Sequence, residues 1–263
     1  MKKLICILLT IILSMAFFTG CAKQKASKKE TIKFAAAASL EKMFEHKLIP
    51  MFLAKNPQVQ AEGVYAGSGK LLIQLEQGLA VDVFIPASPK EMAALQAKGK
   101  IAAASPLLQN KLVLIVPKAN STKNMQSFTD FVKAKQPAIG DPKTVPAGRY
   151  AQEALQKLEL WDKVKAKLSL GSNVVEVLSW VAQGSADAGF VYATDAASND
   201  KVAIVASAPE TLKLAPIIYP VGTLKTSQNK ELAHKFVAFL NSAEARKVYA
   251  EYGFSIPAAP TSK

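Results

Sequence analysis

Four segments of the chain combine small residues with the start of a predicted helix, and each follows a predicted strand. They are AAAASL (35–40), YAGSGK (65–70), GDPKTVPAGRYA (140–151) and GSNVVEVL (171–178). The first turn of a helix has backbone N–H groups without internal partners and the positive end of the helix dipole. Several such turns converging on one point would bind an anion without a charged side chain. Ordinary caps and tight turns are the alternative interpretation.

The donors in these segments are hydroxyl and amide groups. Ser39 and Ser68 place hydroxyls at two helix starts, where Ser39 could also cap the helix that follows. At Ala147-Gly148 no side chain can cap the first turn, so its amides stay free for an outside acceptor. Tyr192 ends the strand in GFVYATDA (189–196) and either donates its hydroxyl into a cleft or packs in the core.

Three catalytic motifs are incomplete. Ser39 to Lys42 matches the Ser-x-x-Lys of penicillin-binding enzymes, but Ser198-Asn199-Asp200 reverses the companion motif and no Lys-Thr-Gly follows. Gly69-Lys70 lacks the Ser or Thr of a phosphate loop. A serine triad needs a histidine base, and both His46 and His234 lie in helical patterns. We therefore expect no enzyme, and a secreted serine acyl-transfer enzyme stays as the catalytic alternative.

Composition narrows the remaining functions. The chain has 263 residues, half of them apolar, enough for one large domain or two lobes. Its formal charge of +13 fits a solvated lysine surface near an anionic membrane, or a field that attracts anions. The lysines are scattered, so nucleic acid binding is not expected. Two cysteines and two histidines disfavour a zinc site.

The N-terminus has the pattern of an export signal. A charged start precedes an apolar run, Leu4 to Phe18, too short for a transmembrane helix of ordinary length. The run ends in Phe-Thr-Gly-Cys (18–21), which resembles the bacterial lipobox. We expect residues 1–20 to be a signal peptide, Cys21 to carry lipid, and residues 21–30 to be a tether. The protein is then extracytoplasmic, in the periplasm or at the outer cell surface.

From residue 31 onward, strand and helix patterns alternate, which predicts an α/β fold with mainly parallel strands. The segments expected as strands are 32–37, 59–65, 82–87, 111–118, 138–140, 188–192, 202–206 and 217–224. Pro50 is expected to kink or restart the first helix, and Asn173 with Glu176 predicts a capping pair. Two β-α-β runs predict two lobes, one of residues 31–110 plus 220–263 and one of residues 111–219.

These segments resemble the molybdate-binding proteins of bacterial ABC importers. The matching stretches are FAAAASL (34–40), YAGSGKLLIQLEQGLAVDVFIPAS (65–88), GDPKTVPAGRYAQEAL (140–155), GSNVVEVLSWVAQGSADAGFVYATDA (171–196), YPVGTLK (219–225) and EYGF (251–254). VPAGRYA and GFVYATDA are specific in combination, and the likeness covers nearly all of the mature chain. The resemblance implies a two-lobed type II periplasmic-binding fold. Each lobe would be a mostly parallel sheet flanked by helices, with two crossing strands and a ligand cleft.

The resemblance also implies the ligand site. In that family uncharged donors hold the oxyanion, and the matching positions here are Ser39, Ser68, Ala147, Val174 and Tyr192. Ala147 and Val174 would act through backbone N–H groups and the other three through hydroxyls. Molybdate carries no proton at neutral pH, so a site of donors alone suits it, whereas a carboxylate would repel it.

The implied function is a lipid-anchored solute-binding protein that captures molybdate, and tungstate with it, and delivers the anion to an ABC permease. No cofactor and no direct metal coordination are expected, and the chain is expected to act as a monomer. Sulfate or another oxyanion is the alternative ligand. Sulfate is a smaller tetrahedron and would leave some donors unpaired, at about 1–3 kcal/mol each.

Overall fold

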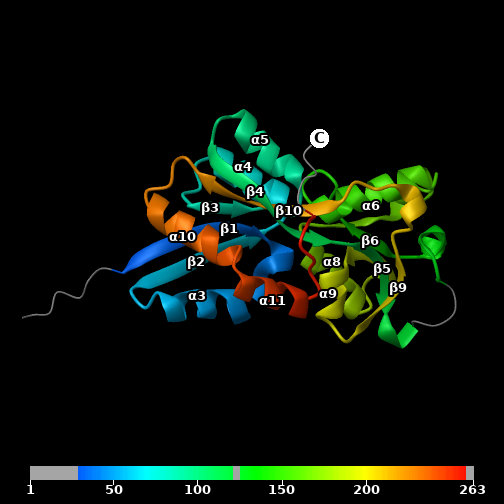
Figure 1. Ribbon diagram of the computed structural model, residues 1–263. Helices are drawn as coiled ribbons and strands as arrows, with labels where there is room; N and C mark the ends of the chain where they lie inside the picture. The colour runs from blue at the N-terminus through cyan, green and yellow to red at the C-terminus, as the bar shows by residue number, and fades with distance from the viewer. Residues whose placement is uncertain (1–28, 121–124, 259–263) are drawn as a thin grey trace, which may run out of the picture.

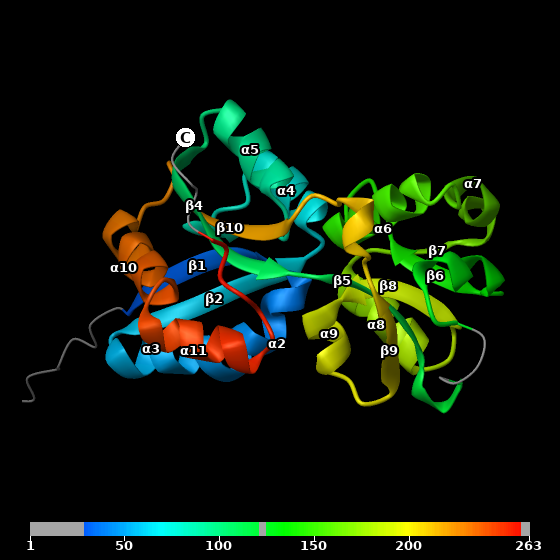
Figure 2. The same ribbon diagram turned by 45° about the vertical axis from the view of Figure 1, so that its right-hand side comes forward.

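Two five-stranded sheets form the protein, which is described by a computed structural model over residues 29–120 and 125–258. The expected signal peptide and Cys21 lie outside these residues. The first sheet has the order β2-β1-β3-β10-β4, with strands Val59–Ala66, Glu30–Ala37, Val83–Ile85, Ile217–Leu224 and Ile101–Asn110. The second has the order β7-β6-β8-β5-β9, with strands Ser169–Gly171, Pro137–Gly140, Ala188–Tyr192, Leu112–Pro117 and Val202–Ser207. The sheets lie side by side as two lobes (Figure 1, Figure 2), which confirms the predicted fold class.

Strand pairing in both lobes is mixed. In the first sheet β1 is parallel to β2 and β3, whereas β10 is antiparallel to β3 and β4. In the second sheet β6 is parallel to β7 and β8, whereas β5 is antiparallel to β8 and β9. The chain crosses between the sheets twice, from β4 into β5 and from β9 into β10. The antiparallel pairs all involve β5 or β10, the strands entered by these crossings, so the parallel prediction holds for the other three-stranded part of each sheet.

Helices cover the faces of both sheets (Figure 1). In the first lobe they are η2 (Ala38–Leu40), α2 (Glu41–Met43), the π-helical η3 (Phe44–Leu48), α3 (Ile49–Lys55), α4 (Ser68–Glu76), α5 (Pro89–Ala97), α10 (Lys230–Leu240) and α11 (Ala243–Glu251). In the second they are η4 (Lys118–Asn120), η5 (Phe128–Lys133), α6 (Pro146–Lys157), α7 (Trp161–Val164), η6 (Lys165–Lys167), α8 (Val174–Ala182), α9 (Ala193–Ala197) and η7 (Glu210–Leu212). Pro50 lies in the first turn of α3, so the helix restarts there as predicted. Among the described residues, no helix is long and apolar enough to cross a membrane.

Aromatic packing fixes the first lobe around β1. The ring of Phe34 lies 5.6 Å from that of Phe44 and 5.4 Å from that of Phe236. Phe52 in turn packs on Phe236 with 5.0 Å between ring centroids. Rings at these separations contribute about 0.5–1.5 kcal/mol per pair beyond their buried area. Helices α3 and α10 therefore pack together with β1 and hold the start of the helical segment that follows this strand.

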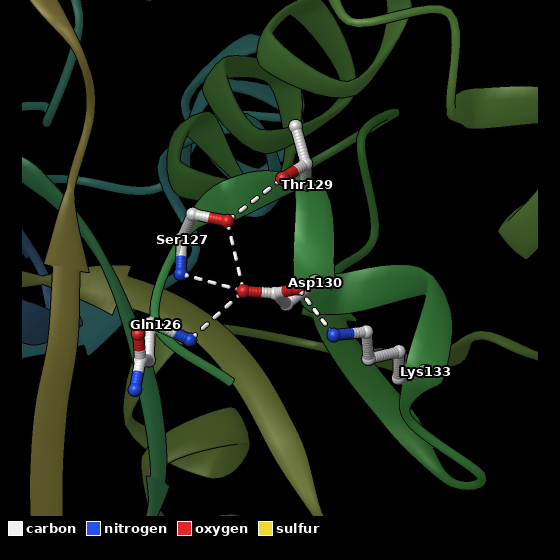
Figure 3. Close-up of polar contacts among 5 residues, drawn as sticks. All are labelled: Gln126, Ser127, Thr129, Asp130 and Lys133. Atoms are coloured by element: carbon white, nitrogen blue, oxygen red, sulfur yellow. Dashed lines mark hydrogen bonds and ion pairs between the residues drawn. The ribbon is translucent and has the colours of Figure 1, made fainter. Parts of the chain in front are cut away.

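The second lobe has a corresponding aromatic cluster that supports β8. Phe128 and Phe131 of the 3₁₀ helix η5 each pack 4.6 Å from the ring of Phe190. The carboxylate of Asp130 accepts the backbone N–H of Ser127 at 3.0 Å, which is the return bond of a capping box, and it also accepts the Ser127 hydroxyl at 2.9 Å (Figure 3). The cap orients η5, and η5 in turn holds β8, the strand that ends at Tyr192.

Candidate functional site

The carboxyl ends of the parallel strands in the two lobes point toward the same place. In the first lobe Ala37 of β1 pairs with Ala66 of β2, so the segments that follow both strands start side by side. In the second lobe Gly140 of β6 pairs with Gly171 of β7 in the same way. Ligands of open α/β sheets bind outside the carboxyl ends of the strands. All four segments identified in the sequence follow one of these strand ends.

A small cavity lies between the lobes at this point. Its lining residues are Ala37, Ala38, Ser39, Ala66, Gly67, Ser68, Ala87, Val145, Pro146, Ala147, Asn173, Val174 and Tyr192. All five predicted ligand residues are among them, and none of the lining side chains is acidic. The cavity volume is about 10 Å³, room for about one water molecule, so the cavity excludes a sugar or a peptide.

The first lobe contributes two serine hydroxyls. The Oγ of Ser68 accepts a hydrogen bond of 2.9 Å from the backbone N–H of Ala87. The Oγ of Ser39 lies 3.0 Å from the hydroxyl of Tyr219, which is 180 positions away in the chain. Neither η2 nor α4 has a side-chain cap, so the suggestion that Ser39 caps its helix is wrong. Neither hydroxyl oxygen is therefore used to cap a helix.

The second lobe contributes backbone amides at the start of α6. The residue before the helix is Val145, which cannot cap it, and Pro146 has no N–H. The first-turn amides of Ala147 and Gly148 therefore have no partner within the helix. A Cβ at Gly148 would lie 1.8 Å from the carbonyl oxygen of Gly140, so only glycine allows α6 to begin this close to β6. This close approach positions the Ala147 amide at the cavity.

The start of α8 is fixed by a cap that the sequence predicted. Asn173 accepts the backbone N–H of Glu176 at 2.9 Å. The carboxylate of Glu176 accepts the backbone N–H of Ser172 at 2.6 Å rather than that of Asn173, so the return bond is shifted by one residue. The cap leaves the amide of Val174, the first residue of the helix, beside the cavity.

Tyr192 supplies a hydroxyl with no protein acceptor. Its side chain is 1% exposed, and its hydroxyl has no hydrogen-bond partner among the described residues. Burial raises the pKa of Tyr192 well above its ordinary value, so the hydroxyl keeps its proton and remains a donor. An unpaired buried hydroxyl costs about 1–3 kcal/mol. An anion in the cavity would provide the missing acceptor.

An ion pair between the lobes was not predicted from the sequence. Arg149 of α6 places Nη2 2.5 Å from Oε1 of Glu91 on α5, and 3.1 Å from Oγ of Ser88. The backbone N–H of Gly69 also donates to the carbonyl oxygen of Thr144 at 2.8 Å, again from one lobe to the other. These contacts join the lobes, and the Glu91 carboxylate balances the charge of Arg149. No local pattern could have paired residues 58 positions apart.

The Ser-x-x-Lys motif does not form a catalytic pair. Nζ of Lys42 donates to the carbonyl oxygen and the hydroxyl of Ser198, at 3.2 and 3.3 Å. Within the described ranges the hydrogen-bond partner of Ser39 is Tyr219. Acyl transfer by this motif would need the lysine within hydrogen-bond reach of the serine, and each is engaged elsewhere.

A second, larger cavity of about 450 Å³ lies beside the first. Its lining includes the ionisable side chains of Glu41, Lys42, Glu45, His46 and Asp195. Asp195 is 5% exposed, and burial raises its pKa to about 7. No group of three His, Cys, Asp or Glu side chains in the part of the chain that the structure describes could hold a metal ion. Acidic residues are thus present near the site but not in the small cavity.

The fold and the site together define a class. Two α/β lobes joined by crossing strands, with an ion-sized cavity between them, are the architecture of a solute-binding protein. The chain belongs to the family described as "Bacterial extracellular solute-binding protein", whose profile matches residues 32–255.

Individual relatives extend this assignment. The chain is 36% identical over 236 residues to the molybdate-binding protein ModA of Haemophilus influenzae, covering 88% of this chain and 91% of the relative. The periplasmic molybdate-binding protein of Azotobacter vinelandii has the same fold, with a TM-score of 0.75, 22% identity and coverage of 86% of this chain and 100% of that one. The sulfate-binding protein SubI of Mycobacterium tuberculosis reaches a TM-score of 0.74 at 19% identity, covering 86% of this chain and 87% of that one. The two TM-scores are nearly equal, so the fold alone does not distinguish molybdate from sulfate.

Proposed function

We propose that the protein captures molybdate, and tungstate with it, and delivers the anion to an ABC permease. The observation that carries the proposal is the buried Tyr192 hydroxyl without an acceptor, in a cavity lined by the four other predicted donors and by no acid. A dianion without protons accepts hydrogen bonds from these donors and needs no acceptor from the protein. The 36% identity to a molybdate-binding protein supports the same ligand.

The proposed division of the chain into lobes, signal peptide and lipid anchor is the one expected from the sequence. We place the first lobe at residues 31–110 plus 220–263 and the second at 111–219, with the cavity between them. We propose that residues 1–20 are removed as a signal peptide and that lipid on Cys21 anchors the chain outside the cytoplasmic membrane. On this proposal the protein is a monomer without catalytic activity, and the anion is cargo rather than cofactor. Ser39, Ser68 and Tyr192 would bind it through hydroxyls, and Ala147 and Val174 through amides.

Sulfate is the competing ligand, and geometry separates it from molybdate. Both are tetrahedral dianions, so charge does not distinguish them. The donors come from rigid elements of two lobes that already contact each other, as the Gly69 to Thr144 hydrogen bond shows. A smaller anion in this frame cannot reach every donor, and each unpaired donor costs about 1–3 kcal/mol. We therefore expect molybdate and tungstate to bind at least tenfold more tightly than sulfate.

Thermal melts of the purified protein test the ligand. A ligand at 100 times its dissociation constant adds about 2.7 kcal/mol to the free energy of unfolding. Molybdate and tungstate should each raise the melting temperature by several degrees, whereas sulfate and phosphate at equal concentration should not. A clear shift with sulfate and none with molybdate would show that the ligand assignment is wrong.

A further inference from the structure

A chain of buried and partly buried hydrogen bonds leads from the crossing between the lobes to Ser39. The backbone N–H of Lys111 donates to Oδ1 of Asn110 at 2.9 Å. Nδ2 of Asn110 lies 2.8 Å from Oγ1 of Thr194 and 3.3 Å from the hydroxyl of Tyr219. The Tyr219 hydroxyl lies 3.0 Å from Oγ of Ser39. Asn110 and Tyr219 are 5% and 0% exposed, so water does not compete for these groups.

The orientation of the Asn110 amide follows from the first member of this chain. A backbone N–H can only donate, so the atom of Asn110 that faces Lys111 is the carbonyl oxygen, and the NH₂ group faces Tyr219. The hydroxyl of Tyr219 accepts from that group at 3.3 Å, which leaves its own proton available to the oxygen of Ser39 at 3.0 Å. The oxygen of Ser39 then accepts, and the remaining proton of Ser39 is directed away from Tyr219, on a residue that lines the small cavity.

We propose that Tyr219 and Asn110 are positioning residues that make Ser39 a donor toward the bound anion. The inference deepens the proposed function and rests on it. Without this chain, the Ser39 hydroxyl could turn its proton to Tyr219 and present a lone pair to the ligand. With this chain, the Ser39 oxygen accepts the proton of Tyr219, and the proton of Ser39 points into the cavity. Ser39 can then donate to a fully deprotonated oxyanion and does not present a lone pair to it.

The proton of Ser68 is also directed by a neighbouring donor, in this case a single backbone N–H group. The Oγ of Ser68 accepts the backbone N–H of Ala87, which cannot reverse its direction. Ser68 therefore needs no further residue to fix its proton. The neighbour of Ser39 is a tyrosine hydroxyl, which can donate or accept, so Asn110 is required to decide between the two.

A double-mutant cycle on molybdate binding tests the proposal. The dissociation constants of the wild type, Tyr219→Phe, Ser39→Ala and the double variant are measured by isothermal titration calorimetry. The phenylalanine keeps the edge contacts of the ring with Tyr192 and Phe254, both at 5.7 Å, and removes only the hydroxyl. Tyr219→Phe should weaken binding about three- to tenfold when Ser39 is present, and less than twofold when position 39 is alanine.

Tyr249→Phe is the matched control. Tyr249 is also buried, and its hydroxyl donates to the carbonyl oxygen of Leu240 at 2.7 Å, within the first lobe and outside the cavity lining. This variant should lose stability without changing the molybdate dissociation constant. An equal effect of Tyr219→Phe with and without Ser39, or no effect at all, would overturn the positioning role while leaving the proposed function intact. A wild type that binds neither molybdate nor tungstate would overturn the proposed function, and this inference with it.

Asn110→Asp gives an independent test, which still tests the proposal if Tyr219→Phe does not fold. A carboxylate offers only acceptors, so the Tyr219 proton would turn toward position 110 and Ser39 would have to donate to Tyr219. The added negative charge weakens binding whether or not Ser39 is present. The loss should be about tenfold greater with Ser39 than with alanine at that position, and equal losses would overturn the proposal.

Discussion

The two walls of the cavity supply the same kind of donor by different means. On the proposed function the first lobe would use the side chains of Ser39 and Ser68, whose oxygens are hydrogen-bonded to Tyr219 and to the Ala87 amide. The second lobe would use the backbone at Ala147 and Val174, where helix starts leave amides without a partner in the helix. Side-chain donors depend on neighbours that fix their protons. Backbone donors depend on where the helix begins, and their protons cannot turn.

This difference determines how each wall can be altered. A serine donor is removed by a single truncation to alanine. A backbone donor survives any truncation and is lost only if the helix start moves. Tyr192 differs from both, because it belongs to the second lobe, yet the donor that it would supply is a side-chain hydroxyl, which has no hydrogen-bond partner among the described residues.

Moving the start of α6 should have the largest effect. In Gly148→Ala the new Cβ would lie 1.8 Å from the carbonyl oxygen of Gly140, so the helix must shift away from β6. We expect a loss of about 1–3 kcal/mol in stability and about a hundredfold weaker molybdate binding, measured by denaturant unfolding and calorimetry. Gln156→Ala, at an exposed site of the same helix, should change neither. Unchanged affinity in Gly148→Ala would show that the second wall does not bind through this helix start.

Removing one hydroxyl from the first wall should have a smaller effect. Ser68→Ala should weaken molybdate binding about tenfold and reduce stability by about 1 kcal/mol, since the Ala87 amide also loses its acceptor. Ser242 accepts the backbone N–H of Ala245 at 3.2 Å as the cap of α11, outside the cavity lining. Ser242→Ala should therefore match the loss of stability while leaving the dissociation constant unchanged. Equal affinities of Ser68→Ala and the wild type would remove Ser68 from the site.

The pH dependence of molybdate affinity should be the smallest of these effects, and it should arise from the second wall. Asp195 follows Tyr192 in the second lobe, and burial raises its pKa from 3.8 to about 7. The folded state therefore favours the protonated carboxyl, and this stabilisation is complete below about pH 4 and lost as pH rises through about 7. Molybdate affinity should fall about threefold between pH 6 and 8 as the carboxylate forms near the anion.

The variant Asp195→Asn provides the comparison for that titration. Its affinity should be constant between pH 6 and 8, and its stability relative to the wild type should rise as pH increases from 4 to 8. Parallel pH profiles of the two proteins, in calorimetry and in unfolding, would show that Asp195 does not titrate in this range.

Much of the fold follows from patterns that are local in the sequence. The buried strand at Leu112–Pro117 and the extended segment at Ile217–Leu224 were both predicted, because continuous apolar runs have few alternatives. Strand β4 was missed, since half of its residues are exposed and small, without the alternation of a half-buried strand. Helix α5 was missed as well, since its weak apolar face resembles that of a loop.

The sequence by itself determined which segments open helices after strands and which of their residues are small or hydroxylated. That information is local, because a helix start or a cap depends on a few neighbouring residues, as Asn173 and Glu176 show. Only the tertiary structure decided that the four segments meet in one cavity, that Arg149 pairs with Glu91, and that Tyr219 lies on Ser39. Those partners are 58 and 180 positions apart, and packing of the two lobes, rather than any spacing along the chain, brings them together.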